Sequence, residues 1–329
     1  MTSAPRRILT LLATLCLAVG AGACGDDDDT TDNGGAAATT PAAADTKVIQ
    51  RDAANASKPT ITVGSKNFTE QFILGEIYAQ TLEAQGFKVK RRLNLGSEQV
   101  AYKALKGGSI DMYPEYTGTA LTSFFKVKTE DVPKDPDQAY EQAKTQYAEN
   151  GITALARTPF QNTYIIASTK ETATKAGNPK TVSELFAKNP NLSISGFPEC
   201  RQRQDCLLGL RDVFGFKGKF VSSDGKFNDL DQGQSDLTLA FSTDPQLALT
   251  DKYAAYMDDK QFFPPYNITL GIREETVTSI GQKAVDTLEA VQEGMTEEAM
   301  RELNRRVELD KQEPKTVAAA YLSEEGFVQ

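Results

Sequence analysis

The segment from residue 60 to residue 112 alternates short β-branched stretches with amphipathic stretches, and this alternation constrains the fold more than any other feature. In order, the predicted elements are a strand at 60–63, a helix at 68–85, a strand at 87–93, a helix that Ser97 begins and a strand at 109–112. Asn67 and Glu70 have capping-box spacing at the start of the first helix. This order indicates an α/β fold built on a parallel sheet with right-handed crossovers.

The third predicted strand runs into the sequence Asp111-Met112-Tyr113-Pro114-Glu115-Tyr116-Thr117-Gly118-Thr119. Pro114 cannot donate to a strand ladder and Gly118 tolerates left-handed dihedral angles, so we expect the strand to end here in a turn. Tyrosines just beyond the carboxyl end of a strand suit a small-molecule site in an α/β protein. The alternative is an ordinary turn with half-buried tyrosines.

The composition excludes several function classes. The chain of 329 residues carries a net charge of −9, which argues against nucleic acid and anionic membrane surfaces as partners. It contains no histidine, so catalytic Ser-His-Asp or Cys-His groups and histidine-ligated zinc are excluded. It also contains no tryptophan, so any aromatic cage must use Tyr and Phe. No cofactor and no metal site is predicted.

The N-terminus has the pattern of an export signal. Two arginines precede an apolar run at residues 8–19, which is too short to span a bilayer, and residues 1–23 are predicted to be a signal peptide. Ala21-Gly22-Ala23-Cys24 resembles a bacterial lipobox, although Ala21 stands where that motif has Leu. The resemblance implies a lipid on Cys24 that anchors the exported protein to the outer face of the cell membrane. Simple secretion with an unmodified Cys24 is the alternative.

The next segment, residues 24–58, is acidic and poor in large apolar residues, so we expect a disordered tether. Beyond it, residues 59–157 and 250–329 are predicted to form a first lobe. Residues 158–249 are predicted to form a second. Cys200 and Cys206 are the cysteines that remain after export and lipidation, and an oxidising compartment favours their pairing.

Four motifs together resemble a known family. They are Gly64-Ser65-Lys66-Asn67-Phe68-Thr69-Glu70-Gln71, Tyr116-Thr117-Gly118-Thr119, Asn162-Thr163-Tyr164 and Ser242-Thr243-Asp244. In this order, across residues 60–329, they resemble the ProX/OpuC-type substrate-binding lipoproteins of osmoprotectant ABC importers. The resemblance implies a two-lobed clamp of periplasmic-binding-protein type II. Each lobe would hold a mixed, mainly parallel sheet flanked by helices. A monomer that works with an ABC permease and its ATPase, and not an enzyme, is expected.

The resemblance also implies a set of ligand-binding residues, namely Lys66, Tyr116, Thr119, Asn162, Tyr164, Arg203, Phe241 and Tyr266. Arg201 is the alternative to Arg203 as the ligand-binding arginine. Two positions depart from the family pattern. Phe241 replaces a tyrosine of the aromatic box, and Cys206 replaces a glycine after the arginine, which is consistent with a local disulfide.

These residue types suit a quaternary ammonium ligand. Such a cation has no N–H donor, so aromatic faces select it through cation–π attraction worth about 0.5–2 kcal/mol per ring. Lys66 and Arg203 are expected to decide between a carboxylate tail and a hydroxyl tail. Glycine betaine, proline betaine, carnitine, choline and ergothioneine all remain possible ligands. Rival hypotheses are an exported hydrolase that uses Asp111 and Glu115, and a ligand-sensing domain that docks on a membrane partner.

Overall fold

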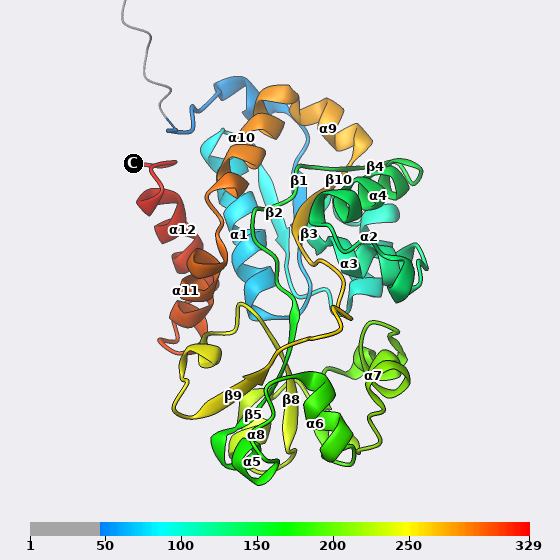
Figure 1. Ribbon diagram of the computed structural model, residues 1–329. Helices are drawn as coiled ribbons and strands as arrows, with labels where there is room; N and C mark the ends of the chain where they lie inside the picture. The colour runs from blue at the N-terminus through cyan, green and yellow to red at the C-terminus, as the bar shows by residue number, and fades with distance from the viewer. Residues whose placement is uncertain (1–46) are drawn as a thin grey trace, which may run out of the picture. The chain divides into compact units, whose positions relative to one another are not determined.

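Two five-stranded sheets organise residues 47–329, the part of the chain that the computed structural model describes (Figure 1). The predicted signal peptide at residues 1–23, the predicted lipidation site Cys24 and the tether up to residue 46 lie outside the described residues. No helix within residues 47–329 is both long and apolar enough to cross a membrane.

The first sheet has the strand order β2-β1-β3-β10-β4. Its strands are β1 Ile61–Gly64, β2 Val89–Arg92, β3 Met112–Tyr116, β4 Ile152–Ala154 and β10 Ile268–Arg273. Strand β1 is parallel to β2 and β3, whereas β10 is antiparallel to β3 and β4. The helical elements between these strands are α1 Thr69–Ala84, α2 Glu98–Lys106, α3 Thr117–Thr119, η2 Ala120–Phe124, η3 Thr129–Asp131 and α4 Pro136–Ala148.

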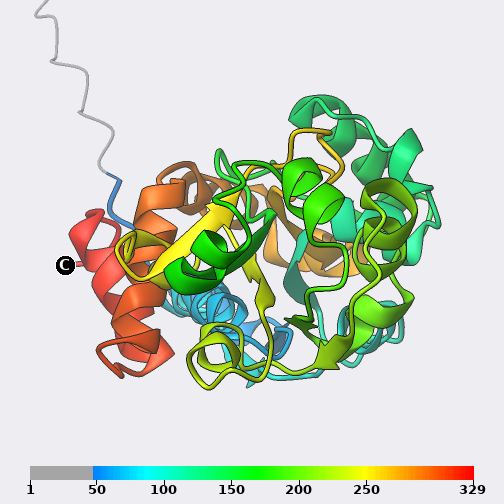
Figure 2. The same ribbon diagram turned by 60° about the horizontal axis from the view of Figure 1, so that its bottom comes forward.

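The second sheet has the order β7-β6-β8-β5-β9 and is brought forward in Figure 2. Its strands are β5 Tyr164–Thr169, β6 Ile194–Gly196, β7 Phe220–Ser222, β8 Leu237–Phe241 and β9 Tyr253–Tyr256. Strand β6 is parallel to β7 and β8, and β5 is antiparallel to β8 and β9. Its helices are α5 Lys170–Lys175, α6 Val182–Lys188, η4 Pro198–Gln202, α7 Leu207–Phe214, α8 Phe227–Asp231 and η5 Pro245–Ala248. The prediction of two α/β lobes with mixed sheets is confirmed.

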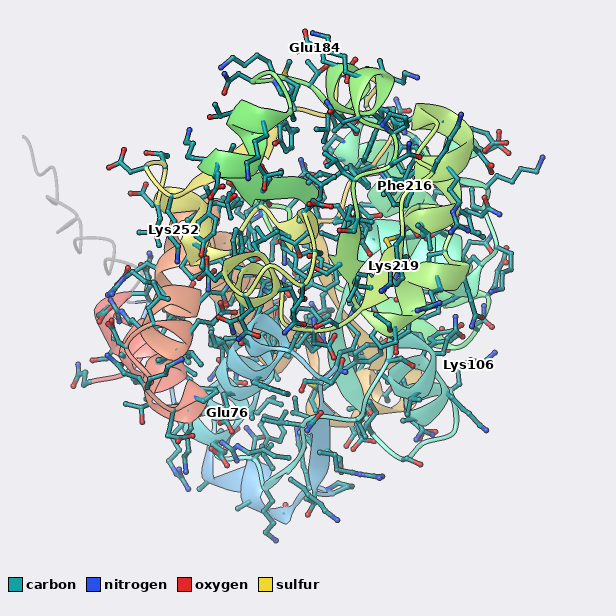
Figure 3. All side chains as sticks on the ribbon, turned by 90° about the horizontal axis from the view of Figure 1, so that it is seen from below. Glu76, Lys106, Glu184, Phe216, Lys219 and Lys252 are labelled. Atoms are coloured by element: carbon teal, nitrogen blue, oxygen red, sulfur yellow. A yellow bond between two sulfur atoms is a disulfide. The ribbon has the colours of Figure 1, made fainter. Side chains whose placement is uncertain are left out.

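The chain ends in a helical tail that belongs to the first lobe. Its helices are α9 Glu274–Ile280, α10 Gln282–Glu293, α11 Glu297–Glu308 and α12 Pro314–Glu324. Helices α11 and α12 pack beside α1 (Figure 1), which makes the first lobe discontinuous in sequence. In Figure 3 the exposed side chains of Lys106 on α2 and Glu184 on α6 lie at the periphery, and side chains fill the interior.

The two lobes are joined by a pair of crossing segments. The first crossing, between β4 and β5, lies at the predicted boundary near residue 158. The return crossing lies between β9 and β10, so the predicted boundary at residue 250 is too early: β9 pairs with β5 and belongs to the second sheet. The crossings also bond to each other, since the amide of Asn162 donates to the carbonyl of Tyr266 at 3.0 Å.

The predicted tether ends earlier than residue 58. Residues 53–57 form a short 3-10 helix, η1 Ala53–Ser57, and the segment before it docks on the first lobe. The amide of Ile49 donates to the carbonyl of Phe327 at 2.8 Å, and the side-chain amide of Asn55 donates to the carbonyl of Gln85 at 2.9 Å. Ile49 also packs on the core. Local polarity suggested disorder here, but these contacts with distant residues order the segment.

The prediction that the third strand spans residues 109–112 and ends before Pro114 is wrong, because the observed strand begins at Met112. Strand β3 continues to Tyr116, and all five of its residues are buried. The amide of Thr117 donates to the carbonyl of Asn267 at 2.9 Å, so by antiparallel alternation the nitrogen of Pro114 points away from β10. On that other side, β1 pairs with β3 only between Val63 and Met112. The nitrogen of Pro114, which carries no hydrogen, therefore points to a side of β3 where no strand residue needs a hydrogen bond from it.

Candidate functional site

A cavity of about 600 Å³ lies between the two lobes. Its size is within the range usual for small-molecule sites. All eight residues that the family resemblance implied line it, from both lobes and from the crossing segments: Lys66, Tyr116, Thr119, Asn162, Tyr164, Arg203, Phe241 and Tyr266. Arg201 is exposed and its guanidinium lies over the ring of Phe220, so Arg203 is the arginine that reaches the cavity.

Three of the four predicted cage rings touch directly. The ring of Tyr164, at the start of β5, lies 5.5 Å from that of Phe241 at the end of β8 and 5.2 Å from that of Tyr266 in the return crossing. Strands β5 and β8 pair Tyr164 with Phe241 in register, which explains why these two rings meet. A cation interacts with an aromatic ring when it lies within about 6 Å of the ring centroid, so one cation could interact with two or more of these rings at once.

Phe68 and Phe197 are aromatic lining residues that the sequence analysis did not assign. Phe68 stacks between two predicted rings, 6.2 Å from Tyr116 and 5.9 Å from Phe241, and it connects Tyr116 to the others. Phe197 stacks on Tyr164 at 6.0 Å. Both could have been found from position, because Phe68 lies inside the first family motif and Phe197 directly follows strand β6.

Gly118 is needed for close approach and not for a left-handed turn. It lies in the short helix α3, directly after Tyr116 and Thr117. A Cβ atom on Gly118 would lie 2.7 Å from the carbonyl oxygen of Pro265 and 2.8 Å from the ring of Tyr266. The hydroxyl of Thr117 also donates to the Pro265 carbonyl at 3.0 Å. The absence of a side chain at Gly118 therefore lets the return crossing place the ring of Tyr266 against α3.

Lys66 forms a buried ion pair with Glu115 on the adjacent strand β3. Burial lowers the pKa of Lys66 and raises the pKa of Glu115, and their mutual attraction opposes both shifts. The ammonium of Lys66 lies 4.4 Å from the ring centroid of Tyr116. The lysine of the first motif thus faces the cavity, but its charge already has a partner from the protein.

Arg203 is held by Asp205 in the same way. Its Nε and Nη2 atoms donate to the two carboxylate oxygens of Asp205 at 2.8 and 2.5 Å. Burial alone would raise the pKa of Asp205, but the guanidinium outweighs burial and holds that pKa below its usual value. Tyr266 donates a further hydrogen bond to Asp205 at 2.6 Å, which joins the return crossing to the second lobe. Thr119 accepts from Arg203 Nη2 at 3.4 Å.

Cys200 and Cys206 form a disulfide, and both are buried. The bridge encloses Arg203 and Asp205, so it restricts the loop that carries the ion pair. Cys206, which replaces the glycine of the family pattern, is one end of this bridge. Helix α7 begins directly after Cys206, without a side-chain cap.

Glu70 was predicted to cap a helix, and this prediction is wrong. The N-cap of α1 is Phe68, and no side chain caps it. The buried carboxylate of Glu70 instead accepts four hydrogen bonds, from Tyr116 Oη at 2.7 Å, Asn162 Nδ2 at 3.0 Å, Thr243 Oγ1 at 2.6 Å and Asn304 Nδ2 at 3.1 Å. Burial raises its pKa despite these donors. Glu70 thereby joins the first lobe to the first crossing and to the segment that follows β8.

The outer part of the cavity lies between α8 and the end of α11. Lys226 pairs there with Asp244 at 2.5 Å and faces Glu308 at 3.8 Å. Asp244 stands at the N-cap position of η5, but its side chain accepts from Lys226 and from the amide of Phe241 and does not cap the helix. Gln246 donates to Glu308 at 3.1 Å, which adds another contact between the lobes.

The carboxylates that a hydrolase would use do not form a catalytic pair. Glu115 is fully buried against Lys66, and Asp111 accepts a hydrogen bond from the amide of Thr62 at 2.7 Å. Asp111 does not line the cavity between the lobes. Within residues 47–329 no group of His, Cys, Asp and Glu side chains is placed to hold a metal ion.

Comparison with known proteins agrees with this geometry. The profile of the substrate-binding domain of ABC-type glycine betaine transport systems matches residues 59–324. A glycine-betaine-binding protein of Pseudomonas aeruginosa is 30% identical over 288 residues, which cover 83% of this chain and 90% of that protein. An ergothioneine transport permease and binding protein of Helicobacter pylori is 30% identical over 285 residues, 85% of this chain. The chain spans about half the length of that relative, 50%.

Solved structures show the same architecture. A crystal structure of a glycine betaine/carnitine/choline ABC transporter matches with a TM-score of 0.66 at 25% identity, and the match covers 80% of this chain and 98% of that chain. This likeness confirms the predicted two-lobed clamp of the periplasmic-binding-protein type II class.

Proposed function

The chain belongs to the family of substrate-binding domains of ABC-type glycine betaine transport systems, as its motifs predicted, and we propose that it captures a small quaternary ammonium compound between its lobes. It then delivers this ligand to the permease of an ABC importer, which its ATPase drives. We propose the same eight ligand-binding residues that the family resemblance implies, from Lys66 to Tyr266, and add Phe68 and Phe197 to them.

The observation that carries the proposal is the group of contacting aromatic rings in the cavity. Tyr164 contacts Phe197, Phe241 and Tyr266 at 5.2–6.0 Å, and Phe68 extends the group to Tyr116. A quaternary ammonium offers no N–H donor, so a site that selects it needs aromatic faces. At about 0.5–2 kcal/mol per ring, several rings supply a large share of the roughly 8 kcal/mol that a micromolar complex requires.

The protein's own cations support this use of the rings. Lys66 and Lys226 lie 4.4 and 5.4 Å from the centroids of Tyr116 and Phe241, and the guanidinium of Arg203 lies 6.0 Å from that of Tyr164. Positive groups are thus already distributed over these faces. The faces of these rings can thus hold a positive group, and a ligand cation has to take a position on them that avoids the repulsion of these residues.

Calorimetric titration tests the proposal. The purified protein is titrated with glycine betaine, proline betaine, carnitine, choline and ergothioneine, and micromolar or tighter binding is expected for at least one of them. Ergothioneine belongs in the panel because a relative at 30% identity is an ergothioneine-binding protein. Failure of every compound to bind would contradict the proposed function.

We further propose that the protein acts by binding and not by catalysis, because the buried carboxylates of Glu115, Asp205 and Glu70 are occupied by cations or by hydrogen-bond donors. Incubation of each panel compound with the protein should leave the compound intact by mass spectrometry. The proposed location is the outer face of the cell membrane, with a lipid on Cys24 and a monomeric folded part. Mass analysis of the N-terminal peptide checks the lipid, and a Cys24→Ser variant should be released from the membrane.

A further inference from the structure

A buried cluster of charges at the wall of the cavity holds more carboxylates than cations. Its two basic groups, Lys66 and Arg203, and the carboxylate of Glu98 line the cavity, and Glu115 and Asp205 pair with the two cations from outside the lining. All five side chains are buried, with side-chain exposures of 9% or less. With one carboxylate for each cation, the charge of one carboxylate remains unbalanced.

Each cation is already committed to its own acid. Lys66 is paired with Glu115, and Arg203 is bound at two of its nitrogens by Asp205. Bidentate pairing is the strongest arrangement for a guanidinium and a carboxylate. A carboxylate on a ligand could reach only the N–H donors that these pairs leave, and it would meet cations whose charge an acid of the protein already neutralises.

Glu98 is the carboxylate left over. It is the first residue of α2, where the helix dipole favours a negative charge. Its Oε1 lies 3.6 Å from Arg203 Nη1 and accepts from Ser123 Oγ at 3.5 Å, both of which are long contacts. Among residues 47–329, the other carboxylate oxygen of Glu98 has no hydrogen-bond partner, and the residue lines the cavity.

We propose that the site selects quaternary ammonium ligands of net charge +1, with a neutral or hydroxyl tail, over zwitterions that carry a carboxylate, and that Glu98 determines this selectivity. The proposal rests on the proposed function. It reverses the expectation that Lys66 and Arg203 would attract a ligand carboxylate, because both are occupied by acids of the protein. A net positive ligand balances the charge of Glu98, whereas a zwitterion leaves Glu98 unbalanced and brings a second anion near it.

The test compares choline with glycine betaine by calorimetry, because the two share a trimethylammonium head and differ in the tail. The wild-type protein is expected to bind choline at least tenfold more tightly than glycine betaine. In Glu98→Gln this ratio should fall to within about threefold, through weaker choline binding, tighter betaine binding or both. Raising the salt concentration should weaken choline binding more than betaine binding.

Glu298→Gln is the matched control. It removes the same charge from the first turn of another helix, α11, where Glu298 is exposed and does not line the cavity. The choline-to-betaine ratio of this variant should equal that of the wild type. Thermal melting of both variants checks that they fold.

The outcomes separate the two proposals. If no quaternary amine binds the wild type, the proposed function itself is wrong. If wild-type protein binds glycine betaine as tightly as choline or more tightly, the function stands and the selectivity proposal is overturned. A tenfold choline preference that survives in folded Glu98→Gln also overturns the role of Glu98.

Discussion

The hydroxyl of Tyr116 donates a hydrogen bond of 2.7 Å to the buried carboxylate of Glu70, and this bond fixes a cavity-lining ring to the start of α1. The same carboxylate accepts from Asn162 in the first crossing and from Thr243 after β8. One acid therefore holds the orientation of the ring and joins both lobes around it.

Two substitutions at Tyr116 should separate the contribution of its ring face to ligand binding from the contribution of its hydroxyl to stability. Tyr116→Phe keeps the ring and should leave ligand affinity within about fivefold, while it lowers the free energy of unfolding by about 1 kcal/mol through the lost hydrogen bond. Tyr116→Ala removes the ring and should weaken binding at least tenfold. Calorimetry and urea denaturation measure the two effects. Normal binding by Tyr116→Ala would place the site elsewhere.

Phe68 should contribute to binding although it lies outside the cage predicted from the sequence. Phe68→Leu keeps much of the apolar volume and removes the aromatic face, so ligand affinity should fall roughly 2- to 30-fold. Phe124→Leu is the control, because Phe124 is also half-buried and stacks on a tyrosine, Tyr102, but lies outside the cavity. The ligand affinity of Phe124→Leu should stay within about twofold of the wild-type value. Equal losses in the two variants would mean that Phe68 acts through stability alone.

Asp205 should stabilise the fold in a pH-dependent way. Asp205→Asn leaves Arg203 buried without its bidentate partner, so the free energy of unfolding should fall by about 3–5 kcal/mol at pH 7. The folded state holds the pKa of Asp205 below its usual value, so its contribution is complete above an unfolded pKa of about 3.9 and is lost as the pH falls through the lower, folded pKa. The difference in the free energy of unfolding between wild type and Asp205→Asn should therefore be constant from pH 5 to 7 and become smaller below about pH 4.

The control for Asp205 is another aspartate paired with an arginine. Asp137 bonds to Arg157 at 2.7 Å but its side chain is 76% exposed. Asp137→Asn should change the free energy of unfolding by less than about 1 kcal/mol. Denaturant titrations at several pH values measure both variants, and equal effects at the two sites would contradict the role of burial.

The disulfide should support both stability and the ligand site. The double substitution Cys200→Ser with Cys206→Ser removes a short loop constraint and should lower the free energy of unfolding by about 2 kcal/mol. Ligand affinity should fall as well, since Arg203 and Asp205 lie within the bridged loop. Unchanged affinity in the folded double variant would show that the Arg203–Asp205 pair holds its geometry without the bridge.

Several features could be predicted from the sequence because they depend on local patterns. Hydrophobic periodicity and turn residues predicted the alternation of β1, α1, β2, α2 and β3, and the motifs predicted which residues line the cavity. Where the predictions were wrong, distant contacts outweighed a local preference. Pro114 fits within β3 because β1 ends beside it. Glu70 accepts hydrogen bonds from residues up to 234 positions away in the sequence and does not cap its own helix.

The charge state of the site could not be predicted in the same way. The motifs identified Lys66 and Arg203 as basic groups but did not show that acids of the protein pair with them. Glu115 lies on β3, next to the strand that precedes Lys66, and Asp205 lies two residues after Arg203. Glu115 lies inside the tyrosine run and was considered only as a candidate catalytic acid. Which acid neutralises which base depends on the register between β1 and β3 and on the folding of the bridged loop.

The central claim, that the aromatic rings select a quaternary ammonium through its charge, is tested most directly with a neutral isostere. The purified protein is titrated with choline and with 3,3-dimethylbutan-1-ol, in which carbon replaces the charged nitrogen and the shape is kept. We expect choline to bind at least 100-fold more tightly, because several rings and Glu98 all attract the positive charge. Equal affinity for the two compounds, or tighter binding of the neutral alcohol, would contradict the account.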